Sequence, residues 1–404
     1  YRDIRYDTVN NITYVKNSHG HLTTYYHNGV LPHRVVDPLN HASSTEYNEY
    51  SEIVCETNEL GAQMRYEYND TGNRIKVVGP DGTAIQFTFD KNQNMVKLIN
   101  QMGNIWLYEY DNQNRLASQT NPLGHSIQYN YENVMLSSVT GPDGSEFHFN
   151  YDQNYNLRSI KEKNKEQFFI EYDALGNVLS STDSCDNCRR FIYDKLNRAV
   201  EIKEPEKNVR KFYYDSGSNI IHAKDNQCEV FFEYGGMGRI LSRSQAGKTI
   251  KFKYDDEEKL IVLQNEIGHT YEFEYNAKSE IIRERGFDGL TREYIKDPAG
   301  RTIRINRQNQ DYSIYKYDIN NRVNNISYSD GSYKNYEYRA DGELIKATND
   351  SLTLSWELDP LGRLTKEFQG EFWISVEYDL LGYRTHIKSS LGLNQKIQRN
   401  HHEE

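Results

Sequence analysis

Cysteine and long apolar runs are the features that this sequence most clearly lacks. Only four of its 404 residues are Cys, too few to hold together a small disulfide-rich scaffold. The hydrophobic fraction is 36% and the mean hydropathy is −0.88. No apolar run approaches the ~18 residues of a membrane-spanning helix. These absences exclude a disulfide scaffold and predict a soluble chain without a membrane span.

A surplus of basic residues is also missing. Lys and Arg number 48 against 59 Asp and Glu, which gives a net charge of −11. Nucleic-acid binding needs a concentrated basic surface, and no basic run supplies one, so we expect no nucleic-acid partner. The sequence also contains no phosphate-binding loop, nucleophile elbow or kinase motif. It therefore predicts a protein that is not an enzyme, with no catalytic residue, no metal site and no cofactor.

What the chain does contain is 33 Tyr, with only eight Pro and 26 Gly. Aromatic residues favour strands. Many of the tyrosines open one recurring phrase, as in YDALGN at 172, YDKLNR at 193 and YDLLGY at 378. We call the first residue of each phrase the anchor. The anchors follow one another at intervals of 20 or 21 residues and are Tyr6, Tyr26, Tyr47, Tyr68, Phe89, Tyr110, Tyr131, Tyr151, Tyr172, Tyr193, Tyr214, Tyr234, Tyr254, Tyr275, Lys296, Tyr317, Tyr338, Leu358 and Tyr378.

Each repeat has the pattern of a β-hairpin. Two residues before the anchor a second aromatic side chain recurs, as at Tyr66, Phe191 and Trp356, and a period of two is that of a strand. Asp or Asn and then Gly or Asn follow the anchor, which is typical of a turn. A second apolar segment and a second turn, such as GPDG at 79 and 141, complete the unit. We therefore predict an all-β fold in which antiparallel hairpins of 20–21 residues pair edge to edge as one ribbon of roughly 38 strands. About 19 such repeats would make residues 1–404 a single array.

A ribbon of this length must wind. At ~4.8 Å per strand it would extend roughly 180 Å along its hydrogen-bonding direction, whereas open sheets rarely exceed ~10 strands without curling. A tight filled solenoid and a wide hollow spiral both satisfy the repeat pattern. The low aliphatic content favours the hollow spiral, because a thick two-layer core would need more Leu, Ile and Val.

The Y-D-x-x-[GN]-[NR] phrase, as at 110, 172, 193 and 317, resembles the Rhs/YD repeat, and the resemblance covers essentially the whole chain. It implies a β-ribbon that spirals into a shell, as in bacterial Rhs polymorphic toxins, the C component of insecticidal toxin complexes and animal teneurins. In the bacterial members the shell encloses a toxic C-terminal domain that is released after delivery.

This resemblance implies a function. We expect a non-catalytic structural shell that encapsulates and carries a C-terminal effector domain. Its partners would be that effector and secretion-apparatus or immunity proteins, and its place would be outside the cell or at the cell surface. Two alternatives stay open: an extracellular adhesion or glycan-binding module of teneurin type, and a self-processing enzyme, which would require a terminal cleavage core.

Three Asp-Pro motifs resemble the D-P-x-G signature of that cleavage core. Asp37, Asp297 and Asp359 all fall where the repeat places a turn, so we interpret them as turn residues. No catalytic residue of the family transfers to this chain. The sequence begins in mid-pattern and stops after NQKIQRNHHEE without a toxin domain, so we expect it to be a piece of a longer protein.

The remaining candidates also have structural interpretations. Cys185 and Cys188 form the one C-x-x-C motif. A redox dithiol and half of a zinc site are the functional readings, but Cys228 and Cys55 lie too many strands away to complete a site. We predict either a local disulfide or two free thiols in a turn. The aromatic rows could stack sugars or bases, but packing is the commoner role of aromatic side chains at strand period.

Two polar series complete the candidates. The Asp after each anchor could line a row of cation sites or cap its own turn. Because that position alternates with Asn69, Glu132, Gly235 and Arg339, we predict capping. A histidine cluster in the first two repeats lacks metal-site spacing, and we expect its members to lie in exposed turns: His19, His21, His27, His33 and His41.

Overall fold

The fold is given by a computed structural model that describes residues 2–162 and 165–398. It divides into two compact units. Unit 1 takes the residues up to 126, residues 274–284 and those from 289 on, and unit 2 takes residues 127–273 and 285–288. We describe each unit by itself.

Strands make up nearly all of the regular structure. The strands of the first 125 residues are β1 (Arg2–Asp7), β2 (Ile12–Asn17), β3 (Leu22–Asn28), β4 (Leu31–Val36), β5 (Ala42–Tyr47), β6 (Ile53–Thr57), β7 (Gln63–Tyr68), β8 (Arg74–Val78), β9 (Ala84–Phe89), β10 (Met95–Ile99), β11 (Ile105–Tyr110) and β12 (Leu116–Thr120). The strands up to residue 275 are β13 (Ser126–Glu132), β14 (Met135–Thr140), β15 (Glu146–Tyr151), β16 (Leu157–Glu162), β17 (Lys165–Tyr172), β18 (Val178–Asp183), β19 (Cys188–Tyr193), β20 (Ala199–Lys203), β21 (Val209–Tyr214), β22 (Ile220–Lys224), β23 (Glu229–Tyr234), β24 (Ile240–Gln245), β25 (Lys248–Tyr254), β26 (Leu260–Gln264) and β27 (Thr270–Tyr275).

The later strands continue the same alternation. They are β28 (Ile281–Arg285), β29 (Thr291–Lys296), β30 (Thr302–Arg307), β31 (Tyr312–Tyr317), β32 (Val323–Tyr328), β33 (Tyr333–Tyr338), β34 (Leu344–Asn349), β35 (Thr353–Leu358), β36 (Leu364–Gln369), β37 (Phe372–Tyr378), β38 (Arg384–Ser389) and β39 (Asn394–Lys396). A single turn of 3₁₀-helix, η1 (Gln308–Gln310), separates β30 from β31. In the part of the chain that the structure describes, no helix is long and apolar enough to cross a membrane.

Within residues 2–162 and 165–398, 39 strands form one antiparallel sheet, which confirms the predicted all-β ribbon of hairpins. The hairpin of β11 and β12 is typical: Tyr110 lies opposite Leu116 and Glu109 lies opposite Ser118, so one residue of β12 is bulged. The same shift in register beside the anchor recurs in both units. Because a bulge fixes the register and increases the local twist, the unit of 20 or 21 residues reproduces one geometry along the chain.

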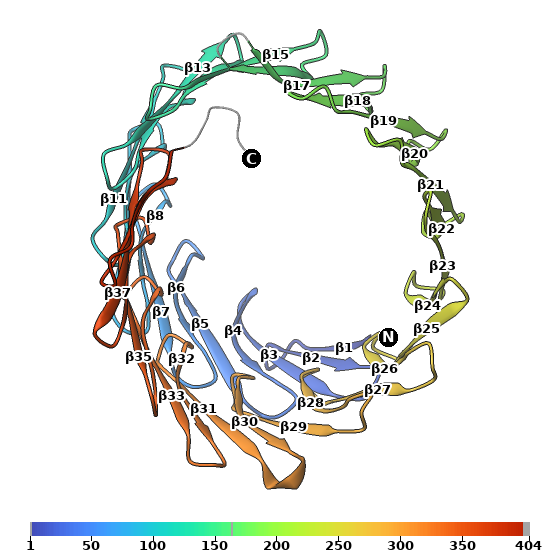
Figure 1. Cartoon of the computed structure of the whole chain (residues 1–404). Coiled ribbons are helices and arrows are strands. Elements are labelled where there is room, and N and C mark those ends of the chain that lie inside the picture. The colour runs from blue at the N-terminus through green and yellow to red at the C-terminus, as the bar shows by residue number, and fades with distance from the viewer. Residues whose placement is uncertain (1, 163–164, 399–404) are drawn as a thin grey trace. The chain divides into compact units, whose positions relative to one another are not determined.

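The two faces of the sheet differ in chemistry, as the period of two predicts. In β11 the anchor Tyr110 and the preceding aromatic residues Tyr108 and Trp106 are half-buried on one face, whereas Glu109 and Leu107 are exposed on the other. In unit 2, strands β15 to β26 follow one another in a single curved layer (Figure 1).

Within each unit, the described residues bury very few hydrophobic side chains. Among the residues that the structure describes, Cys55 at 6% exposure and Val376 at 7% are the only hydrophobic side chains that are buried. A thick core of the usual kind would bury many aliphatic side chains completely. The sheet is therefore stabilised mainly by contacts along and between neighbouring strands.

Candidate functional site

Anchor tyrosines join their repeat to the one before it. The hydroxyl of Tyr193 donates a hydrogen bond to the carbonyl oxygen of Val178 at 2.9 Å, and Val178 begins β18, the strand that follows the preceding anchor. Burial raises the pKa of this tyrosine. Lys296, which stands in place of an anchor tyrosine, donates instead to Thr302 Oγ1 at 2.8 Å.

At least ten anchors within the described residues make the tyrosine bond, and we call these anchors the tyrosine ladder. Their hydroxyls lie 2.7 to 3.1 Å from the accepting carbonyl oxygens, and they are Tyr47, Tyr68, Tyr110, Tyr172, Tyr193, Tyr214, Tyr234, Tyr317, Tyr338 and Tyr378. A phenylalanine ring could occupy the same space but has no donor. The repeat therefore needs tyrosine at this position for a hydrogen bond between repeats.

The Asp after the anchor caps its own turn, as predicted. Asp173 Oδ1 accepts the backbone N–H groups of Leu175 at 2.8 Å and Asn177 at 2.9 Å, while Oδ2 accepts the Asn177 side-chain amide at 2.9 Å. Gly176 takes the left-handed backbone conformation that closes the turn, with φ 85°. Hydrogen bonds from the side chain and then the backbone of Asn177 hold the pKa of Asp173 below its ordinary value. The carboxylate oxygens are thus occupied by donors of the turn, which confirms the capping interpretation.

Two stretches of unit 1 that are far apart in sequence lie side by side, shown in blue and in orange to red in Figure 1. We call the polar contacts between their turns the seam contacts. Lys278 Nζ lies 2.9 Å from Asp37 Oδ2, Asn320 Nδ2 donates to Asp81 Oδ2 at 2.5 Å, and Asn104 Nδ2 donates to the Pro360 carbonyl oxygen at 3.1 Å. In each case a second turn of the earlier stretch meets a first turn of the later one.

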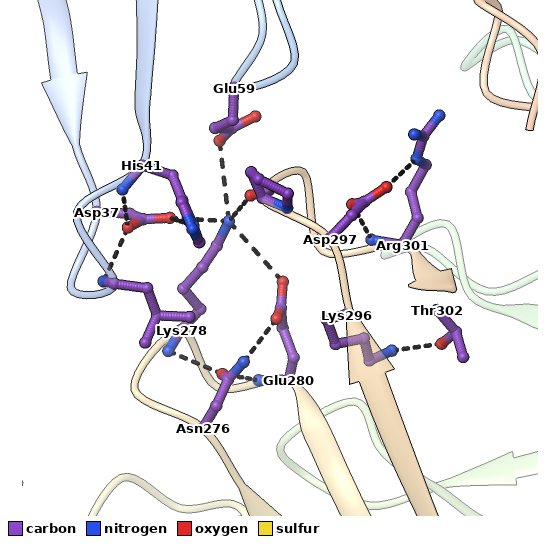
Figure 2. A network of polar contacts seen from close by, with 12 residues as sticks. Asp37, His41, Glu59, Asn276, Lys278, Glu280, Lys296, Asp297, Arg301 and Thr302 are labelled. Carbon is purple, nitrogen blue, oxygen red and sulfur yellow. Dashed lines mark hydrogen bonds and ion pairs between the residues drawn. The ribbon is translucent and has the colours of Figure 1, made fainter. Parts of the chain in front are cut away.

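Lys278 makes the most extensive of these contacts (Figure 2). Its side chain is 15% exposed and that of Asp37 is 13% exposed. The ammonium group also donates to the Pro298 carbonyl oxygen at 2.9 Å and lies 3.9 Å from the carboxylates of Glu59 and Glu280. Burial lowers the pKa of Lys278, but the three carboxylates, Asp37 first, outweigh burial and raise it. Burial likewise opposes the charge of Asp37, and the hydrogen bond from Lys278 together with two backbone N–H groups brings its pKa below the ordinary value. Both groups are therefore charged at neutral pH.

The three Asp-Pro motifs are turn residues, as predicted. Each Asp accepts the N–H of the residue four positions later, at distances of 2.9 Å in Asp37, 3.0 Å in Asp297 and 3.0 Å in Asp359. The sequence did not reveal their second role. Asp37 pairs with Lys278, and the carbonyl oxygens of Pro298 and Pro360 accept the side chains of Lys278 and Asn104.

The C-x-x-C motif lies in a second turn and at the start of β19, as its place in the repeat predicts. All four cysteines are free thiols; Cys185 is exposed, Cys188 is half-buried and Cys55 is buried. Of the two predicted states of the pair, the structure has the thiols and not the disulfide. In residues 2–162 and 165–398, no three His, Cys, Asp or Glu side chains are grouped as metal ligands.

The prediction that the five clustered histidines lie in exposed turns is wrong for four of them. His27 is half-buried in β3 with Nε2 3.0 Å from Thr13 Oγ1, and His33 is exposed but lies in β4. His21 and His41 are half-buried, and each is the last residue of a turn. The backbone N–H of His21 donates to the side chain of Asn17, and that of His41 donates to the side chain of Asp37, both at 2.9 Å. Only His19 fits the prediction.

A charge cluster around the buried Glu204 in unit 2 was also not predicted from the sequence. Arg189 and Arg210 interrupt the apolar face four residues before their anchors, and both pair with Glu204. The nitrogen-to-oxygen distances are 2.6 and 3.3 Å, and the Glu204 side chain is 5% exposed. A glutamate in a second turn thus neutralises the two arginines. The sequence signal that could have predicted this cluster is a basic residue in place of an apolar one in two successive repeats, with a glutamate in the turn between them.

Comparison with known proteins gives one family. The model of the teneurin YD-shell matches residues 100–171 and 160–314, which together span more than half of the chain. No curated protein matches the sequence.

Solved structures share the fold. The crystal structure of TcdB2-TccC3-TEV has a TM-score of 0.78 at 13% identity and covers 95% of this chain and 27% of that one. TcdB2-TccC3 without its hypervariable C-terminal region has a TM-score of 0.63 at 12% identity and covers 97% and 26%. A Tc holotoxin pore of Photorhabdus luminescens has a TM-score of 0.57 at 13% identity and covers 95% and 26%. At this identity the likeness shows the fold alone, and the chain spans 26–27% of the length of these structures.

Proposed function

The chain belongs to the teneurin YD-shell family, and on that premise we propose that it is a non-catalytic part of a shell wall that surrounds and carries a C-terminal effector domain. The observation that carries the proposal is a 39-stranded sheet, counted over the described residues, with almost no buried hydrophobic side chain of its own. A domain that acts by itself normally buries one hydrophobic core. A sheet one layer thick with a bonded path from repeat to repeat is what a wall requires.

The two sets of contacts suit this role. Where it is present, the tyrosine ladder bonds a hairpin to the one before it, and the seam contacts bond one stretch of ribbon to another in unit 1. A wall made of neighbouring stretches of ribbon resists separation only if those stretches are bonded to one another. Lys278 makes such a contact. The fold shared with TcdB2-TccC3 supports the same reading.

The remaining parts of the proposal follow from the wall. We infer that residues 1–404 form one repeat array without catalytic or cofactor-binding residues. The partners would be the effector domain of the same protein and components of a secretion apparatus or immunity proteins. The place of action would be outside the producing cell or at a cell surface.

Protease protection in the complete gene product tests this proposal. We expect the domain that follows the repeats to resist a broad-specificity protease while the shell is folded. It should become sensitive at the denaturant concentration at which the sheet unfolds. A Lys278→Met variant should shift that sensitivity to lower denaturant, whereas Lys346→Met, which removes a lysine whose side chain is 42% exposed, should not. Digestion of the following domain at the rate of the same domain expressed alone would contradict encapsulation.

A further inference from the structure

An open trough crosses the face of the unit 2 sheet on which Glu233, Ser242 and Lys251 lie. It has a volume of about 740 Å³ and lies over β23 to β27, and small-molecule sites occupy roughly 300–1,000 Å³. The strand register explains it. The small residues Ser242 and Ser244 of β24 lie between the larger side chains of β23 on one side and of β25 on the other.

Hydroxyl groups form the floor of the trough. Ser242 is 7% exposed and donates to Glu233 Oε2 at 2.7 Å, and the hydroxyls of Ser244 and Thr249 lie 2.8 Å apart. Across the next strand pair, Gln264 lies opposite Lys251. The floor therefore presents several donors and acceptors at fixed spacing, as a hydroxyl-rich ligand requires.

Two lysines form one wall. Lys251 and Lys253 alternate along β25, so both project from the same face, and both are exposed. Within the described residues, neither side chain makes a hydrogen bond or an ion pair. By contrast, Lys203 and Lys211 elsewhere in unit 2 lie 3.4 and 3.2 Å from the carboxylate of Glu201. The β25 lysines thus offer two positive charges beside the hydroxyl floor that are not tied up in direct ion pairs.

A phenylalanine lies beside the trough, next to the lining residue Ser244. Phe231 of β23 is 48% exposed. One face of its ring stacks on His222, with centroids 4.4 Å apart and planes 6° apart, and His222 in turn stacks on Tyr213 at 4.6 Å and 11°. Since β22 occupies that side, the other face of Phe231 is turned toward β24, where its cross-strand partner is the small Ser244. A flat apolar ring fixed by stacking is therefore available beside the floor.

We propose that this trough binds an acidic saccharide. The apolar face of a sugar ring would pack against Phe231, its hydroxyls would bond to Ser244, Thr249 and Gln264, and its carboxylate or sulfate would lie between Lys251 and Lys253. The Glu233 carboxylate at the β23 side repels an anion, which orients the acidic group toward β25. A basic ligand would instead meet two unpaired lysines. This inference is independent of the proposed shell function.

Calorimetric titration of the full chain tests the site. The acidic probes are a hyaluronan tetrasaccharide and a heparin tetrasaccharide, the neutral probe is maltotetraose, and the simple anion is inorganic sulfate. We expect both acidic probes to bind at least tenfold more tightly than maltotetraose and sulfate, and to bind more weakly at high salt because the charges are exposed. Equal binding of sulfate would reduce the site to an anion site, and equal binding of maltotetraose would remove the role of the lysines; either result overturns the proposal.

Matched variants separate the site from general charge. Lys251→Gln with Lys253→Gln should weaken acidic binding at least tenfold, whereas Lys203→Gln with Lys211→Gln, the same change in net charge, should change it less than twofold. Phe231→Ala should weaken binding at least fivefold and Phe231→Tyr should preserve it. Equal weakening by both lysine pairs, or no effect of Phe231→Ala, would contradict the trough as the binding site. Unchanged far-ultraviolet circular dichroism of each variant confirms that the fold is retained.

Discussion

Replacing Lys278 with Met should loosen the contact between the two stretches of unit 1. The change keeps the length and the apolar stem of the side chain but removes the ammonium group that lies 2.9 Å from Asp37 Oδ2 and 2.9 Å from the Pro298 carbonyl oxygen. Asp37 keeps the two backbone N–H groups that it accepts at 2.8 and 2.9 Å. The turn itself should therefore persist while its contact with the other stretch is lost.

The magnitude follows from the geometry. At 2.9 Å and an effective dielectric constant of ~20, the attraction of the two charges is about 6 kcal/mol. Desolvation of each ion opposes it by several kcal/mol, and breaking a fully buried pair costs about 3–5 kcal/mol. Because both side chains keep some exposure and Asp37 keeps other donors, we expect the variant to lose about 1–3 kcal/mol of local stability.

Native-state hydrogen exchange is the suitable assay, because a repeat array opens locally and a single unfolding free energy is not defined for it. The reporting amides are Asn40, which donates to the Asp37 carbonyl oxygen, and Ser279, which donates to that of Asn276. A double-mutant cycle with Asp37→Asn, which keeps the turn cap, should give a coupling of at least ~1 kcal/mol.

The control cycle uses an exposed ion pair of the same unit. Lys346 and Glu337 lie 2.8 Å apart with side chains 42% and 59% exposed, so Lys346→Met with Glu337→Gln should couple by about 0–0.5 kcal/mol. A Lys278–Asp37 coupling no larger than that of the control pair would refute the reasoning, because the contact would then be an ordinary surface ion pair.

Three further predictions concern the repeat chemistry. Tyr193→Phe should lower the local free energy of opening between its hairpin and the preceding one by about 0.5–1.5 kcal/mol, and Phe89→Tyr should raise it at the equivalent position; hydrogen exchange that changes in neither variant would contradict the tyrosine ladder. The pKa of Asp173 is lowered by the donors of its turn, so its stabilisation is present above the ordinary value near 3.8 and is lost as pH falls through the lower native pKa. Asp173→Asn, which caps without titrating, should abolish that acid dependence when the turn is followed by NMR. Burial and the hydrogen bond to Glu56 at 2.6 Å raise the pKa of Tyr66 to about 12, so its stabilisation is complete below the ordinary value near 10 and is lost as pH rises through about 12; Glu56→Gln should bring its ionisation, measured by tyrosinate absorbance, to lower pH.

The repeat could be predicted from the sequence because its contacts are local and recur. The same pattern recurs in other repeats: an aromatic residue, then the anchor, then Asp, as at Phe191, Tyr193 and Asp194. The pattern can therefore be recognised even where the anchor is substituted, as at Phe89 and Leu358. Strand pairing also joins neighbours in sequence, as between β18 and β19. A one-dimensional pattern therefore determines most of the sheet.

The seam could not be predicted because its partners share no local signal. Lys278 stands three residues after an anchor, where other repeats have Leu175, Leu196 or Met237, which are 74%, 69% and 78% exposed. From the sequence, a lysine at that position is expected to be a solvent-exposed turn residue. Its partner Asp37 is expected to cap a turn, and it does so in addition to pairing with Lys278. Only the placement of two distant stretches side by side makes the pair.

The bulge of one hairpin and the anchor tyrosine of the next are structurally linked. Beside a bulge the ladder of backbone hydrogen bonds is interrupted. In the hairpin of β17 and β18 the register shifts between Glu171 and Tyr172, next to Val178. A carbonyl group left without a donor costs about 1–3 kcal/mol where it is buried. The hydroxyl of the next anchor, Tyr193, donates to the carbonyl oxygen of Val178 itself. The feature that sets the register of one hairpin thus creates the acceptor for the next. A chain that buries few aliphatic side chains can be stable on this basis, and the same requirement accounts for its richness in tyrosine rather than phenylalanine.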